Sequence, residues 1–259
     1  MSPLIGAGEP APFRTVHPVG KAPVLLVCDH AANRIPASLG GLGLPAADLA
    51  RHIAWDIGAA RVAEHLARRL DAPALLSTYS RLVVDVNRTL DCPTLIAEAS
   101  DGAAIAGNRD LSEAARRQRL EQIYHPYHAA VAAAVERFLA QGVRPVLLSI
   151  HSFTPVWDGF QRPWQLGVLW ARDGRLAHRL LAALRAEPDL TVGDNEPYSA
   201  LTGPNQTLDE HAEARGLASA ALEIRQDLIE TEAGAAAWAD RLAAILQPLL
   251  LDPALHAPT

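Results

Sequence analysis

Short apolar runs of strand length alternate along this chain with longer amphipathic segments, and this alternation constrains the fold most strongly. The strand-length runs cover residues 24–28, 74–79, 82–86, 146–150, 166–170 and 220–224. Each is apolar on both faces, as expected for a strand that helices cover on both sides of a sheet. Helical periodicity runs through residues 57–70, 111–139, 176–184 and 235–250. The order predicts an α/β fold, a three-layer α/β/α sandwich around a mostly parallel or mixed central sheet.

The 259 residues contain no internal repeat, low-complexity tract or linker, which predicts a single domain over residues 1–259 with its core at about 22–250. Residues 1–20 and 252–259 lie outside the periodic pattern, and we expect them to be loose ends. The first segment lacks the apolar stretch of a signal peptide, and no segment approaches the ~18 apolar residues of a membrane span. Two cysteines, Cys28 and Cys92, are too few for a disulfide framework. We therefore expect a cytoplasmic protein.

The net charge limits the kinds of binding partner, and the absence of several motifs limits the classes of enzyme. The formal net charge is −6, which argues against a nucleic-acid or anionic-membrane partner. The sequence contains no G-x-S-x-G elbow, no P-loop and no H-E-x-x-H motif. Serine hydrolases, P-loop nucleotide enzymes and metalloproteases with that helical motif are therefore disfavoured.

Two histidines occur where an apolar strand opens into a loop. His30 follows the run 24–28, and His151 follows the run 146–150. In open α/β sheets, ligands bind outside the carboxyl ends of the strands. Neutral imidazoles from two strand ends can bind one divalent cation, and at catalytic sites that cation is usually zinc. The alternative is a pair of hydrogen-bonded loop histidines without a metal.

Two carboxylates are candidates to act with these histidines. Asp56 directly precedes an amphipathic stripe, so it is either the N-cap of a helix or the third, oxygen ligand of the metal. Glu223 lies inside a strand, where a charge is costly unless it is paired or reaches a cavity. Because side chains alternate along a strand, Glu223 shares a face with Arg225. The two residues are then either a general base with a nearby anion-binding arginine, or a structural ion pair.

The segment 79–88 carries polar groups that suit an acidic small-molecule substrate. Arg81 and Arg88 can bind a carboxylate through two hydrogen bonds, and Asn87 can add another donor. The alternative is an ion pair of Asp85 with one arginine that stabilises a strand end. His211, in a polar segment, either lines the same pocket or lies on the surface.

Taken together, these segments resemble the N-formylglutamate amidohydrolase family. The resemblance runs in unbroken order over roughly residues 22–230 and rests on the motifs at 29–36, 55–59, 80–88, 126–128, 149–152, 195–198 and 222–228. It implies a sandwich fold similar to that of zinc carboxypeptidases and aspartoacylases. It also implies hydrolysis of N-formyl-L-glutamate to formate and L-glutamate, a late step of histidine breakdown in some bacteria.

The resemblance also implies roles for individual residues. His30 and His151 match the metal ligands, and Glu223 matches the base. Asn87 and Arg88 match the pair that holds a substrate carboxylate. We add Tyr198, from the motif at 195–198, to the expected substrate-binding residues. The expected reaction is attack on the amide by a metal-activated water.

Two departures from the family pattern leave alternatives open. The carboxypeptidase-like pattern places a ligating Glu three residues after the first His, where this chain has Asn33. The third ligand must therefore come from elsewhere, and Asp56 is our choice. Members that act in histidine breakdown usually have His-Ser-Gly where this chain has His30-Ala31-Ala32. An amidohydrolase for another N-acyl amino acid or a peptide is thus an alternative, as is a metal-free protein that binds a small acid.

The expected oxyanion stabiliser is an arginine. Either Arg225 or Arg81 is expected to help the metal stabilise the negative charge that develops on the amide oxygen.

Overall fold

A central sheet of seven strands organises the computed structural model, which describes residues 3–201, 203 and 205–258. The strand order is β1-β3-β2-β6-β11-β9-β10. The bounds are β1 Phe13–Val16, β2 Val24–Cys28, β3 Ala74–Ser77, β6 Val146–Phe153, β9 Leu166–Leu169, β10 Val192–Asp194 and β11 Ser219–Arg225. The pairs β1–β3 and β9–β11 are antiparallel, and the other neighbours are parallel. The expected mostly parallel α/β fold is confirmed.

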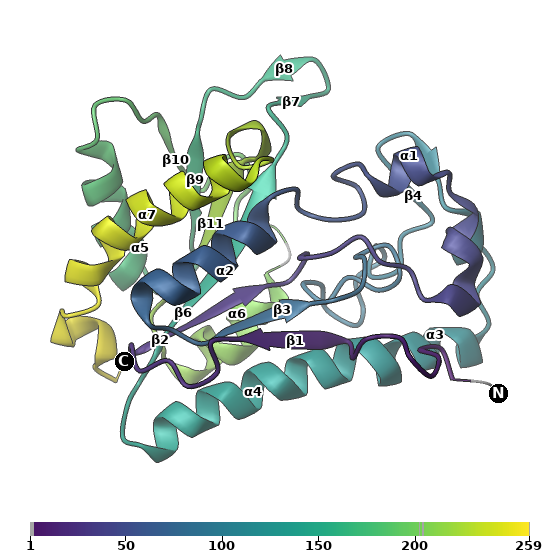
Figure 1. The fold of residues 1–259 in the computed structure, drawn as a ribbon, viewed down its shortest axis with the longest axis horizontal. Coiled ribbons are helices and arrows are strands. Elements are labelled where there is room, and N and C mark those ends of the chain that lie inside the picture. Colours follow the sequence, from purple (N-terminus) through teal and green to yellow (C-terminus); the bar gives the residue numbers. More distant parts are fainter. Residues whose placement is uncertain (1–2, 202, 204, 259) are drawn as a thin grey trace.

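Helices cover both faces of this sheet, because its strands are apolar on both sides (Figure 1). One core contains Leu26 of β2 and the buried faces of α2 (Ala59–Leu70), α5 (Arg175–Arg185) and α7 (Glu232–Leu249). The other core contains Leu25 of the same strand, together with α4 (His125–Ala140) and α6 (Gln206–His211). Alternate residues of one strand thus pack into opposite cores, as the pleat requires.

Shorter elements lie outside the main sheet. They are α1 (Ala46–Leu49), α3 (Glu113–Arg119) and the hairpins β4–β5 (Ala99–Ser100, Ala103–Ala104) and β7–β8 (Val156–Trp157, Phe160–Gln161). A π-helical turn, Leu120–Tyr124, joins α3 to α4. The helical path therefore continues past Pro126, which lies in the first turn of α4, where a missing N–H is tolerated. No helix among the described residues is long and apolar enough to cross a membrane.

The structure corrects three of the local expectations. Residues 82–86 form a loop with turns at both ends instead of a strand, although Leu82, Val83 and Val86 are buried. The apolar run packs one core as a compact loop, and the ends of this loop bring charged side chains together. The expected loose ends are also ordered where they are described. Residues 13–16 form β1, and Leu255, in the short helix Pro253–His256, is buried.

Gly58 lets the chain turn sharply from the segment carrying Asp56 into α2. Its φ is +84°, and a Cβ at this position would lie 2.3 Å from the carbonyl oxygen of Ile229. The turn therefore needs a glycine for two reasons, a left-handed backbone and a close backbone neighbour. Gly142, after α4, also has a positive φ of +74°, but nothing lies within 4 Å of its Cβ position.

We expect Gly58→Ala to lower the free energy of unfolding by on the order of 3 kcal/mol or more, because strain and a backbone clash combine. The matched control Gly142→Ala should cost only about 1–2 kcal/mol, from the left-handed backbone alone. Urea denaturation followed by circular dichroism measures both values. Equal losses would show that the approach of Ile229 does not constrain this turn.

Candidate active site

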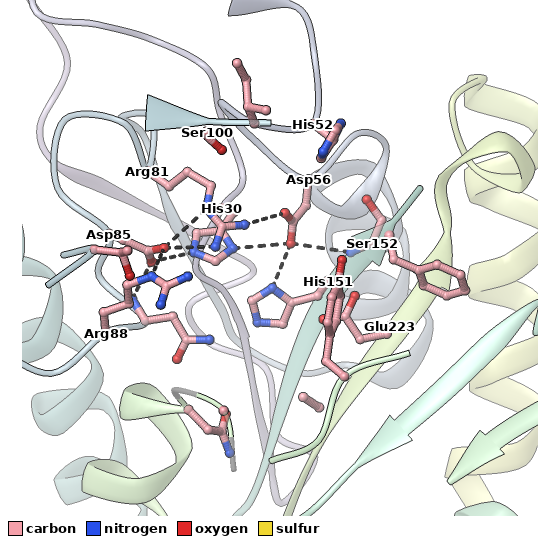
Figure 2. A pocket seen from close by; sticks show the side chains of 18 of the residues that line it. His30, His52, Asp56, Arg81, Asp85, Arg88, Ser100, His151, Ser152 and Glu223 are labelled. Carbon is pink, nitrogen blue, oxygen red and sulfur yellow. Dashed lines mark hydrogen bonds and ion pairs between the residues drawn. The ribbon is translucent and has the colours of Figure 1, made fainter. Parts of the chain in front are cut away.

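A cavity of about 470 Å³ opens at the carboxyl ends of the central strands (Figure 2). His30 follows the end of β2, while His151 and Glu223 lie near the ends of the parallel strands β6 and β11. Glu223 is in register with His151, so both side chains lie on the same face of the sheet. The sheet itself thus brings these three side chains to one cavity.

The two histidines converge on the carboxylate of Asp56. Oδ2 of Asp56 lies 2.7 Å from Nδ1 of His151 and 3.4 Å from Nδ1 of His30. The three residues are buried, and their ligand atoms all lie within 4.8 Å of one another. Asp56 is not a helix N-cap, since that position is Gly58. The geometry of Asp56 is that expected of a third ligand.

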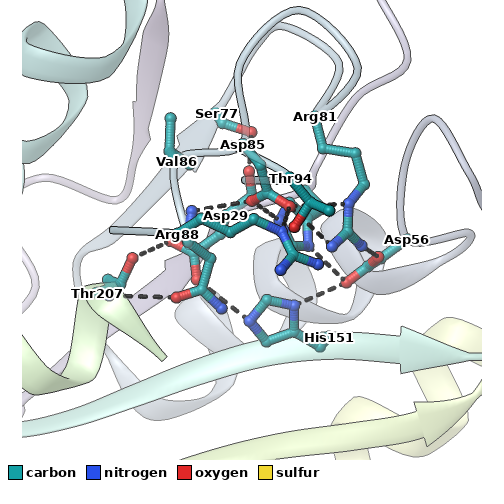
Figure 3. Close-up of polar contacts among 12 residues, drawn as sticks. Asp29, Asp56, Ser77, Arg81, Asp85, Val86, Arg88, Thr94, His151 and Thr207 are labelled. Atoms are coloured by element: carbon teal, nitrogen blue, oxygen red, sulfur yellow. Dashed lines mark hydrogen bonds and ion pairs between the residues drawn. The ribbon is translucent and has the colours of Figure 1, made fainter. Parts of the chain in front are cut away.

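A second carboxylate binds the far nitrogen of each imidazole. Nε2 of His30 lies 2.7 Å from Asp85 Oδ1 (Figure 2), and Nε2 of His151 lies 3.1 Å from Asp29 Oδ2 (Figure 3). Burial lowers the pKa of His151, but hydrogen bonds to Asp29 and Asp56 outweigh it, so the pKa lies well above its usual value. Burial and the charge of Arg81 lower the pKa of His30, but Asp85 and Asp56 outweigh them, so this pKa is also raised. The surrounding carboxylates therefore favour positive charge at both imidazoles.

Hydrogen bonds from neighbouring elements fix Asp29 in place. Tyr127 and Thr207 each donate a hydroxyl to its Oδ1 at 2.7 Å, and Ser149 donates to its Oδ2 at 3.0 Å. Sequence reasoning missed the supporting roles of Asp29 and Asp85. The sequence shows Asp29 directly before His30. Because successive side chains point in different directions, Asp29 instead binds His151 on the neighbouring strand β6.

The two arginines of the turn at residues 80–88 differ in their hydrogen-bond partners. Arg81 donates to Asp85 Oδ2 from Nε at 3.2 Å and Nη2 at 2.9 Å, and to Asp56 Oδ1 from Nη1 at 3.4 Å. Arg88 donates its Nε to Asp85 at 3.1 Å, and its Nη2 has no acceptor among the described residues. Asn87 accepts a hydrogen bond from the backbone N of Thr207 and lines the cavity with Arg88. Both arginines line the cavity; Arg81 pairs with two buried carboxylates, while Arg88 and Asn87 keep donors for a ligand.

Glu223 is a buried carboxyl with a free oxygen. Its side chain lines the cavity, and Oε2 has no hydrogen-bond partner among the described residues. Burial raises the pKa of Glu223 to about 7. A carboxyl with this pKa can both accept and return a proton near neutral pH.

Of the remaining residues considered from the sequence, one lines the cavity and three do not. Tyr198 lines the cavity. Arg225 is not brought to the cavity, because its Nε donates to Asp227 Oδ1 at 2.8 Å. His211 is buried but lies outside the cavity lining, with Nε2 at 2.9 Å from Nδ1 of His128. Asn33 donates its amide to the carbonyl of Leu49 at 2.8 Å and is likewise not part of the lining.

The fold and this cavity define an α/β protein with a histidine–carboxylate cluster and a buried glutamate at the carboxyl edge of its sheet. The model of the N-formylglutamate amidohydrolase family matches residues 22–230, and the chain belongs to this family. It is accordingly a hydrolase that acts on amide bonds.

Solved structures share this fold. A gene product of Agrobacterium tumefaciens is 38% identical, with a TM-score of 0.92 over 95% of this chain and 98% of that chain. An N-formylglutamate amidohydrolase from Ralstonia eutropha shares the fold at 22% identity, with a TM-score of 0.74 over 93% of this chain and 97% of that chain. A search of curated proteins found no match.

The donor set at the centre of the cavity fits a divalent metal ion. Two imidazoles and one carboxylate are the usual protein ligands of a catalytic site that keeps a position open for water. A carboxylate behind each imidazole is the arrangement that orients a metal-binding histidine. A second group, formed by His128, Glu210 and His211, also has its ligand atoms within 4.8 Å of one another, but Glu210 is exposed. The cluster of His30, Asp56 and His151 is therefore the candidate metal site in the cavity.

We expect Arg81→Met to destabilise the fold by about 3 kcal/mol or more, because it removes a cation from two buried carboxylates. The side chains of Asp56 and Asp85 are only 5% and 3% exposed. Arg225→Met is the matched control, since its partner Asp227 is 41% exposed, and it should cost less than about 1 kcal/mol. Urea unfolding after treatment with a chelator measures both variants. Similar losses for the two variants would contradict the structural role assigned to Arg81.

Proposed function

We propose that this chain is a metal-dependent amidohydrolase that cleaves N-formyl-L-glutamate, or a similar acidic N-acyl amino acid, to the free acid and the amino acid. The observation that carries this proposal is the free Oε2 of Glu223 in the same buried cavity as the cluster of His30, Asp56 and His151. Membership of the family supports an amide substrate. The name of the Ralstonia eutropha relative supports formylglutamate in particular.

His30, Asp56 and His151 would hold the cation, and zinc is the first candidate for this donor set. Such an ion, when bound, supplies Lewis acidity toward the amide oxygen and lowers the pKa of water. Asp29 and Asp85 fix the directions of the two imidazoles through their far nitrogens. Arg81 holds Asp56 and Asp85 in place, and it also lines the cavity.

Glu223 is the proposed general base. Its carboxylate takes a proton from the attacking water and then delivers that proton to the departing amine nitrogen. The pKa of about 7 that burial gives Glu223 suits both transfers, because the group is neither a strong acid nor a strong base at neutral pH. Arg225 takes no part, since its guanidinium is paired with Asp227.

Arg88 and Asn87 are the proposed carboxylate-binding pair. Both line the cavity, and the Arg88 Nη2 has no acceptor among the described residues. Their binding energy would place the amide of the substrate beside Glu223 and the histidines. The two free cysteines, Cys28 and Cys92, agree with the reducing, cytoplasmic location that we propose.

A larger acyl group is the second candidate. Part of the cavity wall is apolar and is formed by Ile53, Leu82, Phe153 and Trp157. A formyl group has no apolar surface to place against such a wall, whereas a longer acyl chain does. A panel of N-formyl-, N-acetyl- and longer N-acyl-L-glutamates distinguishes the two candidates by kcat/KM.

We expect Glu223→Gln to lower kcat for N-formyl-L-glutamate by about 10²- to 10⁴-fold, because proton transfer is lost while shape is kept. Formate release measures the rate, and elemental analysis should find the wild-type metal content. The matched control is Glu64→Gln, which removes a surface partner of Arg14 and should leave kcat unchanged. Wild-type turnover by Glu223→Gln would exclude Glu223 as the base.

A further inference from the structure

Arg162 carries a buried positive charge without a carboxylate partner among the described residues. It is 6% exposed, and its Nη1 donates to the carbonyl and hydroxyl of Thr154 and to the hydroxyl of Tyr198, each at 3.2 Å. Its guanidinium carbon lies 5.6, 5.5 and 5.0 Å from the ring centres of Phe153, Trp157 and Tyr198. Ring faces and neutral oxygens stabilise a cation but do not neutralise it. The field of Arg162 therefore still acts on its neighbours.

The hydrogen bond from Arg162 fixes the role of the Tyr198 hydroxyl. A guanidinium can only donate, so the Tyr198 oxygen accepts and its own proton is left for another partner. No described residue accepts that proton. Tyr198 is 43% exposed, but partial burial and the charge of Glu223 raise its pKa while Arg162 opposes the rise, so the phenol stays protonated at neutral pH. Tyr198 is thus a polarised donor.

Tyr198 also lies at the right place in the cavity. Its ring lines the same cavity as Glu223 and Asp56, and the charges of both carboxylates act on its hydroxyl. Arg162 directly follows the hairpin β7–β8, and its guanidinium lies over the ring of Phe153, the last residue of β6 and itself part of the cavity lining. Tyr198 and the proposed base therefore line one substrate-sized cavity.

The two arginines expected from the sequence to stabilise the amide oxygen both form ion pairs with carboxylates of the protein. All three guanidinium nitrogens of Arg81 are bound to Asp85 and Asp56. Arg225 is paired with Asp227. Amide hydrolysis places negative charge on the carbonyl oxygen, and preorganised donors aimed at that charge are usually the largest contribution to such catalysis. Tyr198 lines the cavity with a donor that is not committed, whereas each nitrogen of Arg81 already donates to a buried carboxylate and Arg225 lies outside the cavity lining.

We propose that the Tyr198 hydroxyl donates a hydrogen bond to the substrate amide oxygen as negative charge develops there, and that Arg162 is the positioning residue that aligns and polarises this hydroxyl. The proton stays on Tyr198 throughout, so no bond to it is broken. This inference rests on the proposed amide hydrolysis and adds to it a residue that stabilises the transition state.

The test is a double-mutant cycle on formate release with Tyr198→Phe, Arg162→Met and the double variant. Tyr198→Phe keeps the ring over Arg162 and removes the hydroxyl, both as the proposed donor to the substrate and as the acceptor from Arg162, so kcat should fall by about 10²- to 10³-fold with little change in KM. Arg162→Met should lower kcat in the same way. The double variant should be no slower than Tyr198→Phe, because Arg162 acts through that hydroxyl.

Two further variants separate this role from a structural one. Arg162→Lys keeps the charge and a donor and should recover part of the kcat that Arg162→Met loses. Arg241→Met is the matched control, because Arg241 also lies over a ring, 5.8 Å from the centre of Trp238, but on α7 away from the cavity lining. It should leave kcat unchanged. Circular dichroism and thermal unfolding check each fold, and if Arg162→Met does not fold, Tyr198→Phe and Arg162→Lys still decide the case.

A wild-type kcat for Tyr198→Phe, losses that multiply in the double variant, or a folded Arg162→Lys no faster than a folded Arg162→Met would each overturn the inference alone. Failure of the wild-type enzyme to hydrolyse any N-acyl amino acid would instead refute the proposed function, and this inference with it.

Discussion

The rest of the site depends on the hydrogen bonds that hold two buried histidines between three carboxylates. Asp56 lies between the near nitrogens of His30 and His151, while Asp85 and Asp29 hold the far nitrogens. Carboxylates buried this deeply are stable only with compensating positive charge. Arg81 and the imidazoles provide part of it, and the arrangement favours a further cation at the point where the ligand atoms converge. Glu223 differs from these carboxylates because its Oε2 is unpaired and its pKa is raised.

Local structure places each member of this cluster. Parallel strands β2, β6 and β11 end at one edge, so residues that follow or end them meet there. Gly58 turns the chain so that Asp56 enters the cavity just before α2 begins. The tight turn at 80–88 then adds Asp85 with its arginines. The cavity is therefore a product of strand ends and two turns, with the helices acting as a scaffold.

Much of this arrangement was predictable from the sequence, and the exceptions have physical causes. Apolar runs predicted the buried strands, and the strand-end rule identified His30 and His151. A carboxylate inside an apolar strand identified Glu223. The run 82–86 has the same composition as a strand, so only the tertiary contacts decide that it turns. Alternation placed Arg225 on the face of Glu223, but Asp227 in the following turn binds its guanidinium. Arg162 lies beside a short hairpin outside any periodic pattern, so nothing in the sequence distinguished it.

The most direct test of the central claim is anomalous diffraction from crystals of the protein grown with zinc. The account predicts an ion in the cavity bound by Nδ1 of His30, Nδ1 of His151 and a carboxylate oxygen of Asp56, with Asp29 and Asp85 still on the far nitrogens. An ion found only elsewhere, for example on His128 and His211, or histidines that bind it through Nε2, would contradict the account.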